Sequence, residues 1–266
     1  MEKTNKVLED NFVELTPPPE NFDPSEIEEL LQDVGDTPMF HSFLFYGVSG
    51  IGKSRIAASG GEGTLIINCN ERKPVSIRKS NAKIITIRRV PEDIEKVYWW
   101  LRGGAYKRFH TVALDSLTAL LEMFKRYVVT EECKKNPAKH KIQTDLRDYG
   151  IANDHVKIWI TNFRNLQDVM NVVFIALERP TDEKHDKIRP DLTPGCSNAA
   201  ESAVDIIGRM YLTEIEHKGK EMIVPIIWFG PHEDFMTKET TFTLGDKMLL
   251  PTMPKIIKKI KEGYNK

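Results

Sequence analysis

The feature that most constrains this chain is an eight-residue segment, GVSGIGKS, at positions 47–54. It fits the pattern G-x-x-x-x-G-K-[ST], in which glycines let the backbone wrap around a phosphate and turn its N–H groups inward. An apolar stretch at residues 42–46 precedes the segment, and a helix start at residues 54–59 follows it. A strand, a glycine loop and a helix in this order predict an α/β fold with a phosphate-binding site at the loop.

The members of this segment have expected roles in holding a nucleoside triphosphate. The loop backbone would surround the phosphates, and Lys53 would neutralise the β and γ phosphates as a catalytic cation. The Ser54 hydroxyl would be a ligand of Mg²⁺. We therefore predict that the chain uses ATP with Mg²⁺. The residues expected to contact the nucleotide are Gly47, Val48, Ser49, Gly50, Ile51, Gly52, Lys53 and Ser54.

A second stretch, at residues 111–115, ends in an acidic residue. Four mostly apolar residues lead to Asp115 at the carboxyl end of a predicted strand, where open α/β sheets place their sites. Asp115 is expected to hold the metal together with Ser54. The same position also fits the N-cap of the helix that follows, and both roles can hold at once.

The rest of the chain alternates apolar runs with helical stretches. This alternation predicts a mostly parallel, twisted sheet flanked by helices. The additional predicted strands cover residues 64–69, 83–87 and 171–177, and the predicted helices cover residues 92–102, 117–129 and 151–168. In the final third, residues 206–217 and 221–229 flank Lys218-Gly219-Lys220 and predict a hairpin, so an antiparallel C-terminal edge is expected.

Three regions are predicted along the chain. Residues 1–36 form an acidic N-terminal arm with a short helix at 24–34, residues 37–254 form the core, and residues 255–266 form a basic C-terminal helix. Within the core, residues 131–149 and 180–199 lack periodicity and are predicted to be loops, while residues 240–244 are a candidate strand.

The net charge of −1 conceals two oppositely charged regions. Residues 1–36 hold eleven Asp and Glu against two Lys, and residues 72–108 hold eleven Lys and Arg against three Asp and Glu. The second region suits a surface that meets polyanions, and a solvated face explains it equally well. The three widely spaced cysteines fit neither a disulfide framework nor a zinc site, and no apolar run reaches the ~18 residues of a membrane span. We expect a cytoplasmic protein that makes no membrane contact.

Several of these stretches resemble a known family. The strand that ends in Asp115-Ser116 and leads into an apolar helix, together with the loop at 47–54, resembles the RecA-type branch of P-loop ATPases. More narrowly, the chain resembles phage-encoded RecA-like proteins of the AAA type, some of which act in recombination and single-strand annealing. The resemblance covers about residues 40–255 and also rests on residues 148–163, 171–179 and 189–211. It implies a RecA-like P-loop NTPase fold and, if the chain is phage-encoded, a location in the host cytoplasm.

The resemblance also implies roles for two glutamates. The catalytic glutamate that polarises the attacking water would correspond to Glu71, just past the strand at 64–69. Asn68 and Asn70 stand near it where the family has an aspartate. Glu178, at the end of the strand at 171–177, would sense the γ-phosphate.

Partners are implied in the same way. In this family a basic residue from a neighbouring subunit often completes the site, and Lys238 or Arg209 would correspond to it in a ring or filament of identical chains. The segment 180–199 would correspond to a DNA-binding loop that contacts single-stranded DNA. The residues expected to meet DNA phosphates there are Lys184, Lys187 and Arg189.

Three functions stay open at this point. The first is an ATP-hydrolysing RecA-like protein that acts in phage DNA recombination or single-strand annealing. The second is a P-loop kinase of a small molecule or nucleotide, which would need a pocket for the phosphoryl acceptor. The third is a nucleotide-switched binding module without significant turnover, which the unusual stretch at 68–71 favours.

Overall fold

The computed structural model describes residues 23, 25–28, 31, 39–70, 74–136, 145–179 and 187–265. Two units are distinguished along the chain, Met1–Thr37 and Pro38–Lys266. The first unit contains α2 (Ser25–Glu28). Of the helix predicted for residues 24–34, residues 25–28 are helical and Leu31, whose side chain is exposed, is not. The other residues of that prediction lie outside the described residues.

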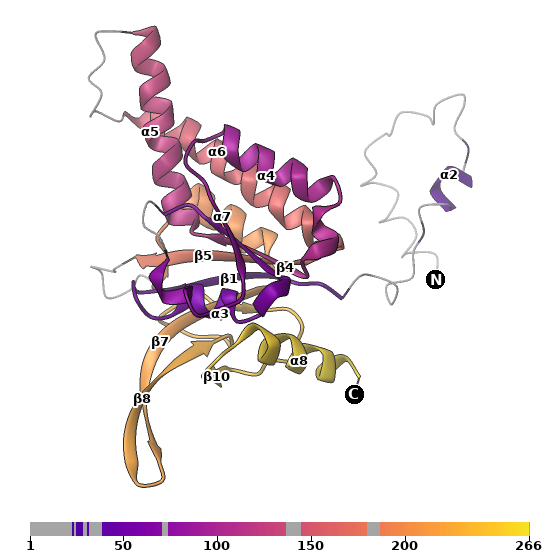
Figure 1. Cartoon of the computed structure of the whole chain (residues 1–266), viewed down its shortest axis with the longest axis vertical. Helices are drawn as coiled ribbons and strands as arrows, with labels where there is room; N and C mark the ends of the chain where they lie inside the picture. The colour runs from indigo at the N-terminus through magenta and orange to yellow at the C-terminus, as the bar shows by residue number, and fades with distance from the viewer. Residues whose placement is uncertain are drawn as a thin grey trace, which may run out of the picture. The chain divides into compact units, whose positions relative to one another are not determined.

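The second unit is built on one sheet (Figure 1). Within the described residues, ten strands pair in the order β10-β8-β7-β1-β5-β4-β2-β3, with β6 beside β5 and β9 beside β7. The strands from β3 to β7 in this order pair in parallel. Strand β8 is antiparallel to β7, and β10 is antiparallel to β8. The predicted fold class is thus confirmed. The strands are β1 (Ser42–Gly47), β2 (Thr64–Asn68), β3 (Lys83–Thr86), β4 (Thr111–Asp115), β5 (Asn171–Arg179), β6 (Arg189–Pro190), β7 (Ile206–His217), β8 (Lys220–Trp228), β9 (Lys238–Glu239) and β10 (Lys247–Leu249).

Helices cover both faces of this sheet (Figure 1). One face carries α4 to α7 and the other carries α3 and α8, and each face has its own hydrophobic core. The helices are α3 (Lys53–Ala58), α4 (Glu92–Arg102), α5 (Leu117–Lys135), α6 (Leu146–Arg164), α7 (Pro194–Ala203) and α8 (Met253–Tyr264). Short 3₁₀ turns lie at η2 (Gly61–Gly63), η3 (Val75–Ile77), η4 (Ala105–Arg108) and η5 (Asn165–Asp168).

The central strands β1, β2, β4 and β5 are mainly apolar because both of their faces are buried. In β1, Leu44 and Tyr46 pack in the core under α4 to α7, while Phe43 and Phe45 pack in the core under α3 and α8. Successive side chains of a strand point to opposite faces, so a buried strand needs an unbroken apolar run. This is why the central strands were predictable from short apolar runs.

The predicted loop at residues 131–149 is partly helical. Helix α5 continues to Lys135, and α6 already begins at Leu146. The last turns of α5 carry the pair Glu131–Lys134, and Asp145 with Asp148 forms a capping box at the start of α6. These charged, local interactions support helices without an apolar period, so hydrophobic periodicity missed them.

Two further expectations need correction. The predicted loop at 180–199 contains the start of α7, where the Thr193 hydroxyl accepts a hydrogen bond from the Cys196 N–H and Pro194 occupies the first turn. Residues 240–244 do not form a strand, because Phe242 has a φ of 55° and turns the chain away from extended geometry. The edge pairing is made by β9 and β10 instead.

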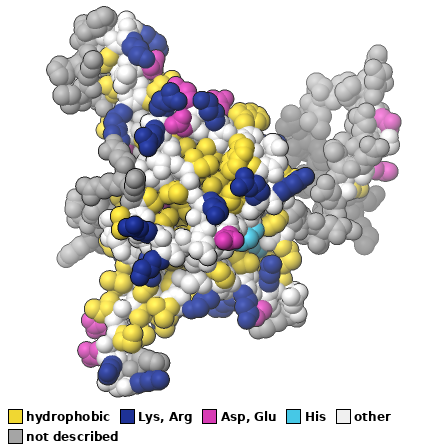
Figure 2. Space-filling view, in the orientation of Figure 1, with side chains coloured by type: hydrophobic (Ala, Val, Ile, Leu, Met, Phe, Trp, Pro, Cys, Tyr) yellow, Lys and Arg dark blue, Asp and Glu magenta, His cyan; other side chains and the backbone are white. Residues whose placement is uncertain are grey.

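Charged side chains are visible on the face seen in Figure 2. On the face seen in Figure 2, Lys and Arg side chains are spread over several elements rather than gathered in one basic patch. Apolar side chains are exposed on the projecting hairpin of β7 and β8, among them Leu212, Met222 and Ile223. In the described ranges, every helix is too short or too polar to cross a bilayer.

Candidate functional site

The glycine loop between β1 and α3 is folded tightly rather than extended. Gly50 and Gly52 adopt positive φ values of 82° and 108°, which side chains disfavour. A Cβ atom on Gly47 would lie 2.4 Å from the main-chain oxygen of Met210, so the close approach of β7 also requires glycine there. Val48, Ser49 and Ile51 complete the turn. The loop is therefore a compact turn whose conformation depends on its glycines.

Lys53 is buried at the start of α3. It is 7% exposed, and its Nζ donates hydrogen bonds of 2.8 Å each to the main-chain oxygens of Gly47 and Val48. Burial lowers the pKa of Lys53 to about 8, while the carboxylates of Asp115 and Glu178 act in the opposite direction. Within the described residues, this buried ammonium hydrogen-bonds to its own loop alone, so it is well suited to receive an anion.

Asp115 meets the loop from β4. Its side chain is 5% exposed and lines the same cavity as the Ser54 side chain. Burial raises the pKa of Asp115, and the Ser54 hydroxyl, the Lys53 charge and the Asn70 amide each counteract that rise. The N-cap of α5 is Ser116, whose hydroxyl accepts from the Ala119 N–H. The neighbouring residue therefore performs the capping role, and Asp115 faces the loop.

Sheet register explains why these residues meet. Strand β5 lies between β1 and β4, so Gly47 pairs with Leu177 and Asp115 pairs with Ile175. All three strands are parallel, and their carboxyl ends open at the same edge of the sheet. One cavity of about 620 Å³ at this edge is lined by Lys53, Ser54 and Asp115 among others, which is large enough for a nucleotide.

The end of β2 contributes a residue that the sequence did not single out for contact. Asn70 Nδ2 lies 3.0 Å from the main-chain oxygen of Asp115 and 3.5 Å from its carboxylate Oδ1. Asn68 accepts a hydrogen bond from the Asn70 N–H, which holds this turn in place. Only the register between β2 and β4 reveals this contact. The predicted catalytic residue Glu71 lies outside the described residues.

Glu178 and Arg209 form an ion pair across β1. Arg209 Nε lies 3.0 Å from Glu178 Oε2, and the two side chains are 17% and 14% exposed. The Arg209 guanidinium also lies over the Phe235 ring at 4.9 Å. Arg209, expected as a cation for a neighbouring subunit, is thus engaged within its own chain.

The other predicted cations lie away from the cavity. Lys238 Nζ donates to the main-chain oxygens of Glu201 and Val204 at the end of α7. Lys187 Nζ donates to the main-chain oxygen of His232, and Arg189 is exposed on β6. Lys184 lies outside the described residues. Of the predicted site residues, the structure therefore brings the loop and Asp115 together. Glu178 lies close enough for its charge to act on Lys53.

A metal at this edge would need oxygen atoms from more than protein carboxylates. No group of three or more His, Cys, Asp or Glu side chains that could hold a metal occurs in the described part of the chain. Ser54 and Asp115 offer two oxygen ligands, which suits a cation that takes its other ligands from phosphates and water.

Comparison with known proteins adds to this geometry. A family model described as "AAA domain" matches residues 39–241. Among solved structures, the chain is similar to a KaiC-like protein from the hyperthermophilic archaeon Pyrococcus horikoshii OT3, with 11% sequence identity, 75% of this chain and 81% of that chain covered, and a TM-score of 0.38. No curated protein matches the chain.

Proposed function

Because the chain belongs to the AAA domain family, we propose that it binds ATP with Mg²⁺ beside residues 47–54. We propose that it then hydrolyses the bond between the β and γ phosphates of ATP. The observation that carries this proposal is the contact between the glycine loop and β4. Lys53, Ser54 and Asp115 line one cavity, and the Ser54 hydroxyl lowers the pKa of Asp115. A phosphate chain held by the loop would end beside a carboxylate that can hold a metal.

Nucleotide binding would use the loop backbone and Lys53. The N–H groups between Gly47 and Ser54 would surround the β and γ phosphates. Lys53 would exchange its two carbonyl partners for phosphate oxygens, which makes the charge-assisted hydrogen bonds that a buried ammonium favours. The pKa of Lys53, lowered to about 8 by burial, would rise when an anion binds beside it.

Ser54 and Asp115 would hold Mg²⁺, because hydroxyl and carboxylate oxygens are the ligands this cation prefers. When bound, Mg²⁺ supplies positive charge that neutralises phosphate oxygens and favours phosphoryl transfer. Asp115 must be ionised for this role. The Ser54 hydroxyl, the Asn70 amide and the charge of Lys53 all favour its ionised form against the effect of burial.

Water activation is assigned to Glu71, on the resemblance to RecA-like ATPases. Its neighbour in sequence, Asn70, donates a hydrogen bond to the main-chain oxygen of Asp115. Glu178 is assigned the sensing role because its charge acts on Lys53 and its carboxylate is held by Arg209. Electrostatic stabilisation of the γ-phosphoryl group by Lys53 would supply much of the rate.

The direct test is to titrate the protein with ATP in the presence and absence of Mg²⁺ and to measure phosphate release. Magnesium-dependent binding and release are expected. Replacing the proposed base in Glu71→Gln should slow release at least about tenfold while ATP still binds. An unchanged rate would remove Glu71 from the mechanism, and a protein that binds no ATP with Mg²⁺ would refute the proposal.

The biological task in this proposal is phage DNA recombination or single-strand annealing, with single-stranded DNA as partner and a ring or filament of identical chains. It is motivated by the sequence resemblance and by Arg189, which pairs with Arg179 at the end of β5. Lys238 or Arg209 would act on a neighbouring subunit only after release from its present partner. ATP turnover with and without single-stranded DNA, and negative-stain microscopy with both ligands, test this. No stimulation together with monomers throughout would contradict it.

A further inference from the structure

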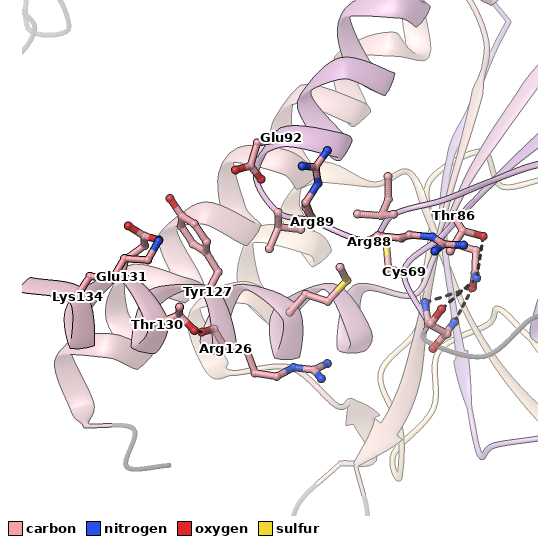
Figure 3. Close-up of a pocket in the computed structure, with 15 residues that line it drawn as sticks. Cys69, Thr86, Arg88, Arg89, Glu92, Arg126, Tyr127, Thr130, Glu131 and Lys134 are labelled. Carbon is pink, nitrogen blue, oxygen red and sulfur yellow. Dashed lines mark hydrogen bonds and ion pairs between the residues drawn. The ribbon is translucent and has the colours of Figure 1, made fainter. Parts of the chain in front are cut away.

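A second cavity adjoins the nucleotide cavity and has no role in the proposed hydrolysis. It measures about 780 Å³ and lies between α5 and the segment that leads from β3 into α4. Figure 3 shows the residues of 86–92 on one side of this cavity and those of α5 on the other. Both cavities are lined by Asn68, Cys69, Asn70 and Arg126. Whatever occupies the second cavity therefore lies next to the nucleotide cavity, across the end of β2.

The wall formed by α5 is chemically mixed. Met123, Tyr127, Thr130 and Lys134 follow one another at spacings of three or four residues, so they form one stripe along the helix. The stripe presents a thioether, a phenol ring, a hydroxyl and an ammonium in that order. Ile87 and Val90 add apolar surface on the opposite side. A ligand that fits this wall has an aromatic or apolar part and a polar, anionic part.

The charges at the rim favour an anion of low charge. The lining includes the cations Arg88, Arg89, Arg126 and Lys134 and the anions Glu92 and Glu131. Four positive and two negative charges leave a balance of +2, which matches one phosphate group better than a triphosphate.

The exposed cations at this rim are only weakly engaged. Arg89 pairs with Asp93 at 3.6 Å and Lys134 pairs with Glu131 at 2.6 Å, and both cations are mostly exposed. Exposed ion pairs contribute little to stability, so a ligand phosphate can replace the carboxylates. In the described ranges, no ion pair engages the guanidinium of Arg88, which makes it the strongest candidate for a phosphate contact.

We propose that this second cavity binds a nucleotide unit, with its phosphate at Arg88 and its base along the wall that contains Tyr127. The unit can come from a free nucleoside monophosphate or from a single-stranded nucleic acid, since both present the same phosphate and base. The inference rests on the proposed function, because the unit would lie beside the γ-phosphate of bound ATP. Aromatic side chains and a basic rim are the features that bind single nucleotides without sequence preference.

Binding is tested with the full chain while the nucleotide cavity is saturated with a nonhydrolysable ATP analogue and Mg²⁺. The probes are dTMP, followed by calorimetry, and a fluorescent oligothymidylate of about 12 nucleotides, followed by anisotropy. Two variants attack the cavity by different means. Arg88→Glu reverses the charge at the rim, and Thr130→Trp fills the cavity from an exposed position on α5. Arg102→Glu is the matched control, because Arg102 is exposed at the end of α4 and lines neither cavity.

We expect Arg88→Glu and Thr130→Trp each to weaken binding by about tenfold or more, and Arg102→Glu by less than about twofold. Unfolding midpoints within about 3 °C of the wild type show that the variants are folded. Binding of both probes identifies the free nucleotide as sufficient, and binding of the oligonucleotide alone identifies a strand as the source. The proposal is overturned if neither probe binds, if Thr130→Trp has no effect, or if the control weakens binding as much as Arg88→Glu. Failure of the ATP analogue to bind the wild type would instead refute the proposed function.

Discussion

The two adjoining cavities share the end of β2 but differ in where their charges lie. In the nucleotide cavity, Lys53 and Asp115 are almost fully buried, and Lys53 is hydrogen-bonded to fixed main-chain oxygens. In the second cavity, Arg88, Arg89 and Lys134 are exposed. A buried charge is expensive to desolvate, so it persists only where geometry compensates for the cost. An exposed charge is screened by water and salt, so it does not need precisely placed partner groups.

This difference predicts two kinds of chemistry. Buried, fixed charges stabilise the transition state of a reaction, because they need no reorganisation when charge develops. Exposed charges attract a ligand and adjust its affinity with ionic strength. We therefore expect changes in the nucleotide cavity to abolish function and changes in the second cavity to modulate it.

The largest expected effect comes from Lys53→Ala. Removing the buried ammonium should weaken ATP binding or lower turnover by about 100-fold or more, since one preorganised charge contributes that much. Equilibrium titration with ATP and Mg²⁺ and a phosphate-release assay measure both quantities. Lys107→Ala, at an exposed position in η4, is the control and should change neither by more than about twofold. Equal effects in the two variants would break the contrast between buried and exposed charge.

A somewhat smaller loss is expected for Asp115→Asn. The amide keeps the shape of the carboxylate but lacks its charge, so turnover should fall by about 100-fold while ATP still binds. The Mg²⁺ concentration that gives half-maximal turnover should rise as well. This is measured by titrating Mg²⁺ at fixed ATP. If that concentration did not change, Asp115 would have no part in holding the metal.

The pH dependence of ATP binding sharpens the comparison further. The pKa of Lys53 in the free protein is about 8, and a bound phosphate raises it, so binding takes up a proton above that pH. Affinity should be constant below about pH 8 and fall by up to about tenfold per pH unit above it. Calorimetry from about 1 pH unit below to about 1.5 pH units above this pKa, in buffers of different ionisation enthalpy, detects the proton uptake.

The second cavity should not show this dependence. Arginine stays protonated throughout this pH range, so the affinity of an oligothymidylate for a rim that contains Arg88 and Arg89 should be flat. A fall in its affinity with the same midpoint as ATP binding would show that the two cavities do not act separately.

The smallest effect is expected for Ser116→Ala. Ser116 caps α5, and loss of an N-cap costs about 1 kcal/mol of stability, which is about 2–4 °C in the unfolding midpoint of a domain of this size. Because α5 lines both cavities, ligand binding in both should weaken, and more so in the nucleotide cavity, which Ser116 itself lines. The control is Ser202→Ala, which removes an exposed hydroxyl in α7. That hydroxyl does not cap the N-terminus of a helix. A loss confined to one cavity would show that the helix does not couple them.

The sequence predicted the parts of the site that depend on local conformation. The spacing of Gly47, Gly52 and Lys53 constrains a turn within a few residues, and Asp115 follows directly from the apolar run of its strand. Contacts that depend on strand register were out of reach. Asn70 meets Asp115 only because β2 and β4 pair with Asn68 opposite Asp115.

The same limit applies to the predicted cations and to the second cavity. Arg209 and Lys238 looked available for a neighbouring subunit, but their partners come from other elements, 31 to 37 residues away along the chain. The second cavity needs α5 to run beyond residue 129, where the predicted helix ended. Charged pairs such as Glu131–Lys134 extend that helix, and a hydrophobic pattern does not register them.

The ion pair that joins β5 to β7 also bears on how this sequence can change over time. Glu178 and Arg209 lie on either side of β1, and neither side chain reaches much solvent. Replacing one partner alone would leave the other charge without its partner and lower the stability by about 3 kcal/mol. Exchanging both for apolar residues often leaves the stability unchanged. Relatives of this chain are therefore expected to covary at positions 178 and 209, keeping the acid and the base together or losing them together.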